Sequence, residues 1–190
     1  TAADRVNVIL TNPPFGGIEE PGIEAGFPAD VRTKETADLF LVLIQHLLKP
    51  GGRAAVVLPD GFLFGEGSKS RIKEKLLTEC NLHTIVRLPN GVFNPYTGIK
   101  TNLLFFTKGQ PTQHIWYYEH PYPQGVKTYN KTKPIRIDEF DAEFFGFTPH
   151  AARTLQSGGH DVRETRHVDA LGHHADRDHP LVGGRGEGAD

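Results

Sequence analysis

Residues 11–17, TNPPFGG, combine a side-chain amide, two prolines and an aromatic ring within seven positions. The Asn12 side-chain carbonyl and the Pro13 backbone carbonyl can both accept hydrogen bonds. Pro13 and Pro14 fix φ and remove competing N–H donors, so these acceptors are held in place. Two acceptors aimed at the N–H groups of an aromatic amine would free its delocalised lone pair, and Phe15 offers a face on which the ring can stack. If the substrate carries such an amine, the segment is suited to its alkylation, which needs no strong base because the amine loses its proton once alkylated.

The elements around this motif predict a layered α/β sheet. The segment 6–10, VNVIL, is apolar and β-branched, as is typical of a buried strand. Apolar runs predict further strands at 53–58, 82–88, 102–107 and 114–119, and helical periodicity predicts helices at 36–48 and 68–79. Ligands on such sheets bind beyond the carboxyl ends of the strands, and Asn12 follows one of these ends.

The expected helix 36–48 is apolar on most of its surface. Its main stripe has helical spacing and consists of Phe40, Leu43, Ile44, Leu47 and Leu48. Because Leu39, Leu41 and Val42 add to this stripe, we expect the helix to be buried nearly all round. Gly51 and Gly52 can supply a left-handed cap at its end.

Composition excludes several classes of protein. The chain has 37% hydrophobic and 23% charged residues, which is typical of a globular domain, and no apolar run reaches the roughly 20 residues of a membrane span. The single cysteine, Cys80, excludes an internal disulfide and fits a cytoplasmic location. A formal net charge of −2 is unlike a protein that grips DNA alone over a large surface. The absence of methionine indicates an internal piece of a longer protein.

A break in composition near residue 150 divides the chain. Residues 1–150 hold 44 Phe, Tyr, Ile, Asn and Lys residues in total, and residues 151–190 hold none. A shifted reading frame in GC-rich DNA or a natural disordered terminus would each explain the break, and metal binding by tail histidines is a weaker alternative. Those histidines are His160, His167, His173, His174 and His179. We expect 1–150 to be a partial catalytic domain, 151–190 to be a non-integrated tail, and no metal site.

Three segments carry a resemblance to a known family. NPPF at 12–15 follows the first expected strand, ADLFLVLIQHLLKPGGRAAVVLPDGFLF spans 37–64, and LPNGVFNPYTGIKTNLLFF spans 88–106. In this order they resemble the methylation (M) subunit of type I restriction–modification systems, which are S-adenosylmethionine-dependent N6-adenine DNA methyltransferases. The tetrapeptide alone is shared by several methyltransferase families, so the order of the three segments is the more specific signal.

The resemblance implies a fold and a set of site residues. The fold would be α/β, the C-terminal part of a Rossmann-like methyltransferase sheet that is mixed, with an antiparallel hairpin at its end. The implied catalytic motif is Asn12, Pro13, Pro14 and Phe15, with Asn12 also bordering S-adenosylmethionine. Phe93 would stack on the flipped adenine opposite Phe15, or simply anchor its loop. Phe40 would border the cofactor adenine, or simply belong to the core. Asp60, in the LPDG segment, could approach the ligand, but its sequence context favours a turn aspartate.

One departure from the family pattern leaves alternatives open. Only eleven residues precede the NPPF motif, where such enzymes place a Gly-rich cofactor loop and an acidic ribose contact, and GEG at 65–67 is a weak substitute. The resemblance implies DNA as the substrate, and the specificity (S) and restriction (R) subunits as partners. A methyltransferase acting on a protein glutamine or an RNA base amine, and a non-catalytic assembly piece, remain as alternatives.

Overall fold

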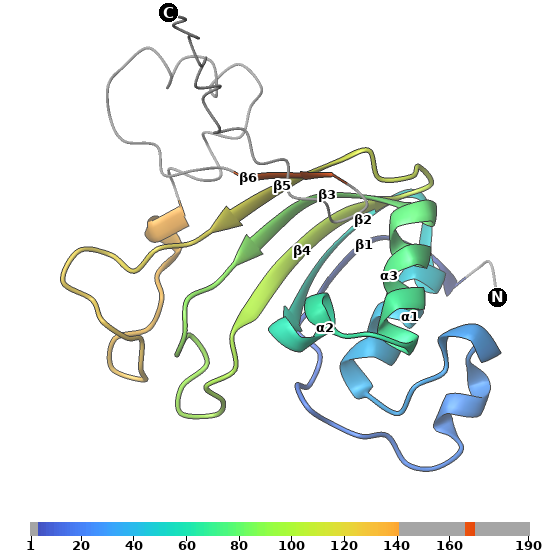
Figure 1. Cartoon of the computed structure of the whole chain (residues 1–190), viewed down its shortest axis with the longest axis horizontal. Coiled ribbons are helices and arrows are strands. Elements are labelled where there is room, and N and C mark those ends of the chain that lie inside the picture. The colour runs from blue at the N-terminus through green and yellow to red at the C-terminus, as the bar shows by residue number, and fades with distance from the viewer. Residues whose placement is uncertain (1–3, 141–165, 170–190) are drawn as a thin grey trace, which may run out of the picture.

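A computed structural model describes residues 4–140 and 166–169 of the chain. They form one mixed sheet of six strands in the order β1-β2-β4-β3-β5-β6, with helices packed against it (Figure 1). The strands are β1 Val6–Thr11, β2 Leu48–Pro59, β3 Cys80–Arg87, β4 Thr101–Lys108, β5 His114–Glu119 and β6 Arg166–Asp169. The α/β class expected from the sequence is confirmed.

Strand directions place the functional end of the sheet. β1 runs parallel to β2, and β3 runs parallel to β5. β4 is antiparallel to both of its neighbours, so it fills the gap between β2 and β3 and forms the expected antiparallel hairpin with β3. The carboxyl ends of β1, β2, β3 and β5 consequently meet at one edge of the sheet, which is where ligands bind on folds of this kind.

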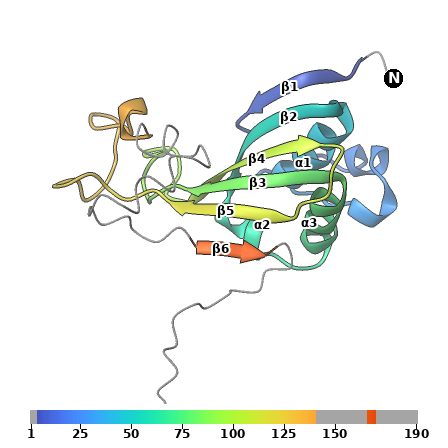
Figure 2. The same cartoon turned by 90° about the horizontal axis from the view of Figure 1, so that it is seen from above.

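The three α-helices cover one face of the sheet (Figures 1 and 2). They are α1 Thr36–Leu47, α2 Asp60–Phe64 and α3 Ser68–Glu79, and short 3-10 turns lie at Ile23–Gly26, Ala29–Val31 and Ile137–Phe140. Leu41 of α1, Phe62 of α2 and Ile72 of α3 pack in one buried cluster with alternate residues of β2 and β4. Successive side chains of a strand point to opposite faces of the sheet, so alternate residues of β2 and β4 face the helices and belong to the cluster.

The opposite face of β1 is open, which corrects the expectation that 6–10 is a buried strand. Val8 is 51% exposed and Leu10 is 76% exposed, although both are large apolar residues. β1 is the last strand of the sheet, and within residues 4–140 and 166–169 nothing pairs with its outer edge. A β-branched sequence forms a strand there, but in the described part of the chain no layer covers it from the second side.

Helix α1 also differs from its expected packing. Its buried residues include Leu41, Ile44 and Gln45, whereas Leu43 is 40% exposed and Phe40 is half-buried. The stripe facing the sheet is therefore rotated from the one expected, because apolar residues all around the helix made several stripes possible. The helix ends at Leu47 without a glycine cap, and Gly51, at φ 77°, lies inside the span of β2 instead.

The expected tail falls mostly outside the described residues. Of residues 151–190, only Arg166–Asp169 is described, as strand β6, and it pairs antiparallel with β5. Those four residues pair with the sheet edge, and the division into a partial catalytic domain at 1–150 and a non-integrated tail at 151–190 stays a prediction. The tail histidines other than His167 lie outside the described residues. Among the helices described, none combines the length and apolar character required to span a bilayer.

Candidate active site

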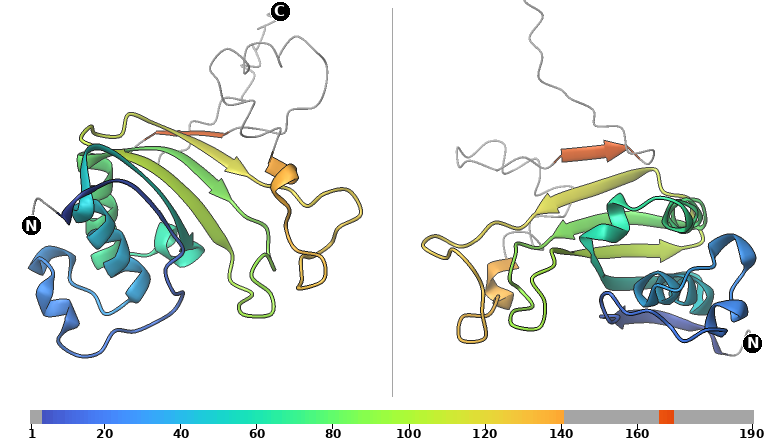
Figure 3. Two further views of the ribbon diagram at one scale, coloured as in Figure 1. Left: turned by 180° about the vertical axis from the view of Figure 1, so that it is seen from behind. Right: turned by 60° about the horizontal axis from the view of Figure 1, so that its bottom comes forward.

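The carboxyl end of β1 lies at the edge where the parallel strands end (Figure 3). Asn12 is the first residue after it. The Asn12 and Pro14 side chains are exposed, whereas Pro13 is buried and Phe15 is half-buried. The buried proline anchors the turn and the exposed amide is left accessible to a ligand. This is the arrangement expected if Asn12 acts as an acceptor and Pro13 fixes it.

Phe15 and Phe93 lie against each other, although they are 78 positions apart in the sequence. Their ring centroids are 5.3 Å apart at an interplanar angle of 82°, an edge-to-face contact. The loop 88–100, which joins β3 to β4, carries Phe93 to the end of β1. The two predicted stacking residues are thus brought together, but their rings touch, so a base enters between them only when one ring rotates away.

A short bridge ties the motif to the start of α1. Gly17 accepts a hydrogen bond from the backbone N–H of Thr36 at 3.0 Å, and Ile18 pairs antiparallel with Glu35. Gly17 packs so closely that a Cβ there would lie 2.7 Å from the Thr36 hydroxyl oxygen. The position therefore requires glycine, and the bridge fixes Asn12 relative to the helix that carries Phe40.

Phe40 is half-buried and belongs to neither of the two buried clusters. Nearby on α1, the buried Asp38 carboxylate accepts a hydrogen bond from Lys69 of α3 at 2.6 Å. Burial opposes the Lys69 charge, but Asp38 and Glu35 outweigh it and raise the pKa of the ammonium. This ion pair fixes the first turn of α1 against α3. Among the described residues, no ring contact joins Phe40 to Phe15 or Phe93, and its place beside the cofactor adenine stays a prediction.

A polar network that the sequence interpretation missed lies at the same edge. Asp60 accepts hydrogen bonds from Arg87 at 2.6 Å and from the side-chain amide of Asn102 at 2.9 Å. Burial opposes the charge of Arg87, but Tyr117 and Asp60 outweigh it and raise the pKa of the guanidinium. Because Arg87 and Asn102 are register partners at the base of the loop 88–100, Asp60 clamps the loop that presents Phe93. It begins α2 and does more than close a turn. An ion pair between a helix and a strand that lie far apart in the sequence leaves no local sequence signal.

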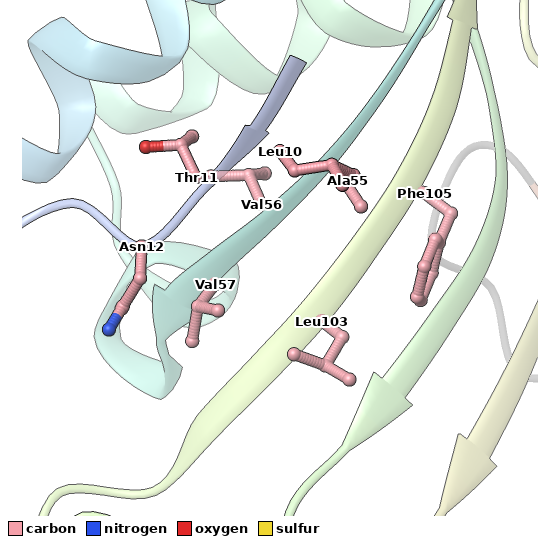
Figure 4. Close-up of a pocket in the computed structure, with 8 residues that line it drawn as sticks. All are labelled: Leu10, Thr11, Asn12, Ala55, Val56, Val57, Leu103 and Phe105. Carbon is pink, nitrogen blue, oxygen red and sulfur yellow. The ribbon is translucent and has the colours of Figure 1, made fainter. Parts of the chain in front are cut away.

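An open hollow of about 400 Å³ lies beside Asn12, and Figure 4 shows the side chains that line it. Apolar side chains from β1, β2 and β4 supply almost all of its lining, which comprises Leu10, Thr11, Asn12, Ala55, Val56, Val57, Leu103 and Phe105. A hollow of this character offers few groups to a charged ligand. We attribute it to the uncovered face of the sheet, and Asn12 and Thr11 are the polar residues in its lining.

Comparisons with known proteins agree with this arrangement. Residues 1–166 match the family of N-6 DNA methylases. The chain belongs to this family. It is 71% identical over 140 residues to the type I restriction enzyme EcoEI methylase subunit of Escherichia coli, a match that covers 74% of this chain and 29% of that relative.

Two solved structures give the same picture. A type I modification subunit from Vibrio vulnificus YJ016 is 55% identical, with a TM-score of 0.74 over 77% of this chain and 32% of that one. A chain from a structure of type I restriction–modification complex assembly is 42% identical, with a TM-score of 0.68 over 82% of this chain and 30% of that one. The chain thus spans about a third of the length of these relatives in the N-6 DNA methylase family.

Proposed function

We propose that this chain supplies the target-amine half of a methylase that transfers a methyl group to N6 of adenine in DNA. The observation that carries the proposal is the contact of Phe93 with Phe15, three positions after Asn12, just beyond the carboxyl end of β1. These residues provide an acceptor for the amine N–H and two rings for the base, the combination that a flipped adenine requires. The family and the type I relatives favour DNA over a protein glutamine or an RNA base.

The residues act by holding and orienting the amine. The side-chain carbonyl of Asn12 and the backbone carbonyl of Pro13 accept hydrogen bonds from the amine N–H groups. The nitrogen lone pair is thereby directed out of the ring plane. The amine held by Asn12 and Pro13 would take up the methyl group that S-adenosylmethionine would supply, and the alkylated nitrogen would release its proton to water. Phe15 and the rotated Phe93 hold the ring in place.

The fit to S-adenosylmethionine is partial. The cofactor supplies an electrophilic methyl group on sulfur, and its adenine would border Phe40, which is half-buried and outside both buried clusters. Asn12 would border it as well. Neither residue is a carboxylate that could bind the ribose, so we assign to this chain one edge of the cofactor site.

The relatives also suggest the partners. One similar chain comes from a structure of type I restriction–modification complex assembly. We propose DNA as substrate and the specificity and restriction subunits of such a system as partners, with target recognition supplied by the specificity subunit.

The test uses a chimaera, the EcoEI methylase subunit carrying this chain's sequence over the matched 140-residue segment. The EcoEI chimaera, combined with its specificity subunit, is expected to form N6-methyladenine in duplex DNA, detected by mass spectrometry of the digested nucleosides. Methylation of transfer RNA or of a glutamine peptide in preference to DNA would instead support the second methyltransferase class. Cofactor binding with no methylated product on any substrate would support a role in assembly alone.

Gly17→Ala is expected to lower the turnover of the EcoEI chimaera about tenfold, because misplacing a reacting group by about 1 Å can cost up to about 10²-fold. The added methyl would lie 2.7 Å from the Thr36 hydroxyl and displace the motif from α1. Steady-state kinetics on DNA measure the effect. The double variant Gly17→Ala/Thr36→Ala should recover most of the rate, and Gly26→Ala, which meets nothing within 4 Å, serves as the control. Full activity of the single variant would show that the bridge does not position the motif.

A further inference from the structure

Charge is unevenly distributed between the site and the rest of the chain. The loops 88–100 and 120–137 hold five Lys and Arg residues and no Asp or Glu, whereas the whole chain has 21 basic and 23 acidic residues. Both loops extend from the edge of the sheet where the candidate site lies (Figure 1). We call these two segments the lysine loops; their basic residues are Lys100, Lys127, Lys131, Lys133 and Arg136.

Direct contacts make the lysine loops one surface. The Tyr122 hydroxyl donates to the Asn90 carbonyl at 2.8 Å, and the Asn94 side chain donates to the Tyr129 carbonyl at 3.2 Å. Gly91, at φ 81°, lies so close to the second loop that a Cβ would be 3.1 Å from the Tyr129 carbonyl. Phe93 sits two positions after Gly91, so the second loop is fixed beside the ring that faces Phe15.

Three of the basic side chains keep their charge available. Lys127, Lys131 and Lys133 are exposed, and no carboxylate in the described part of the chain pairs with them. Arg136 differs, because its Nε lies 3.0 Å from an Asp138 carboxylate oxygen.

The turn that carries two of these lysines is ordered. The Asn130 and Lys133 backbones exchange hydrogen bonds of 3.1 Å, and the Asn130 side-chain oxygen accepts from the backbone N–H groups of Thr132 and Lys133 at 3.0 Å. An asparagine that closes such a turn holds it in one conformation. Lys131 and Lys133 are therefore presented from a fixed position.

We infer that the lysine loops hold the phosphates of the DNA strand that carries the target adenine. The inference rests on the proposed function and adds the surface that holds the substrate. Exposed lysines are point charges without the forked geometry that reads base edges, so they contribute sequence-independent affinity. Tyr96, 88% exposed in the loop 88–100, offers an aromatic face to an unpaired base nearby. The surface carries the aromatic side chains of Phe93 and Tyr96 beside its lysines. A nucleic-acid strand, with one charge per nucleotide and a base on each, fits it better than an acidic polypeptide does.

The test measures binding of a fluorescent DNA duplex by anisotropy, over about 50–200 mM salt, because each lost phosphate contact reduces the log–log salt slope by about 0.9. Lys131→Gln/Lys133→Gln is expected to weaken binding about tenfold and to reduce that slope by about 1–2. The matched control is Lys49→Gln/Arg53→Gln, which removes the same charge from exposed positions toward the start of β2. Both pairs are made in the 190-residue chain and in the EcoEI chimaera, so that loss of folding in one protein does not remove the comparison.

Three outcomes would overturn the inference. The first is equal weakening of DNA binding in both double variants, and the second is no weakening in either. The third is that Lys131→Gln/Lys133→Gln loses binding to a fluorescent polyglutamate peptide while it retains DNA binding, which would identify an acidic protein as the partner. The result is separable from the proposed function. Unchanged DNA binding alongside N6-methyladenine formation contradicts only the lysine loops, whereas lysine-dependent DNA binding with no methylated adenine contradicts only the proposed reaction.

Discussion

Replacing Asn12 by alanine is expected to lower methyl transfer by the EcoEI chimaera about 10²–10³-fold, since loss of one positioned acceptor at a reacting group costs roughly 3–4 kcal/mol. The side chain is exposed at the carboxyl end of β1, with Pro13 buried behind it. Its removal leaves the Pro13 carbonyl as the sole acceptor for the amine N–H groups, so the nitrogen lone pair stays delocalised. Cofactor binding should largely survive, because Asn12 only borders that site. Single-turnover methylation and calorimetric cofactor titration measure the two effects separately.

The control for this prediction lies on the same strand. Asn7→Ala makes the same chemical change at the opposite end of β1, where the side chain is also exposed, and should leave the methylation rate unchanged. Near-normal methylation by the Asn12→Ala variant would remove Asn12 from the reaction. Equal losses in both variants would indicate that the strand itself, rather than the acceptor, is disturbed.

The elements of the fold were predictable because their sequence signals are local. Helix α3 spans Ser68–Glu79 and β5 spans His114–Glu119, as expected from their periodicity. Packing was less predictable where it depends on neighbours far away in the sequence. Leu10 lies in a segment whose sequence is typical of a buried strand. It is nevertheless 76% exposed, because nothing in the described part of the chain covers that face of β1.

The features of the candidate site also differ in whether the sequence alone could predict them. Asn12 at a strand end and Phe15 beside it follow from the tetrapeptide, whereas the Phe15–Phe93 contact needed the fold to bring the loop 88–100 to β1. The Asp60–Arg87 ion pair joins α2 to β3 and leaves no spacing that a single sequence reveals. The charge of the lysine loops was hidden for a related reason, because a net charge of −2 averages over the whole chain.

The open side of β1 determines how we expect the 190-residue chain to behave when it is purified alone. Val8 and Leu10 are 51% and 76% exposed, and in residues 4–140 and 166–169 no strand pairs with the outer edge of β1. An unpaired apolar strand edge beside an uncovered face favours association with other chains. We therefore expect the purified chain to sediment as dimers or larger species at micromolar concentration. We also expect calorimetric titration to detect no S-adenosylmethionine binding, because we assign only one edge of that site to this chain.

Substitutions that add charge to the open strand test the cause of this association. Val8→Lys/Leu10→Lys should shift the chain toward monomer in sedimentation velocity, because charged side chains on an edge strand oppose edge-to-edge pairing. Leu43→Lys is the matched control, since Leu43 is a 40% exposed leucine on α1, away from β1. A monomeric parent chain that binds S-adenosylmethionine with micromolar affinity would contradict both expectations and place the cofactor site within these residues. Association relieved equally by Leu43→Lys would instead locate the contact on the helical face.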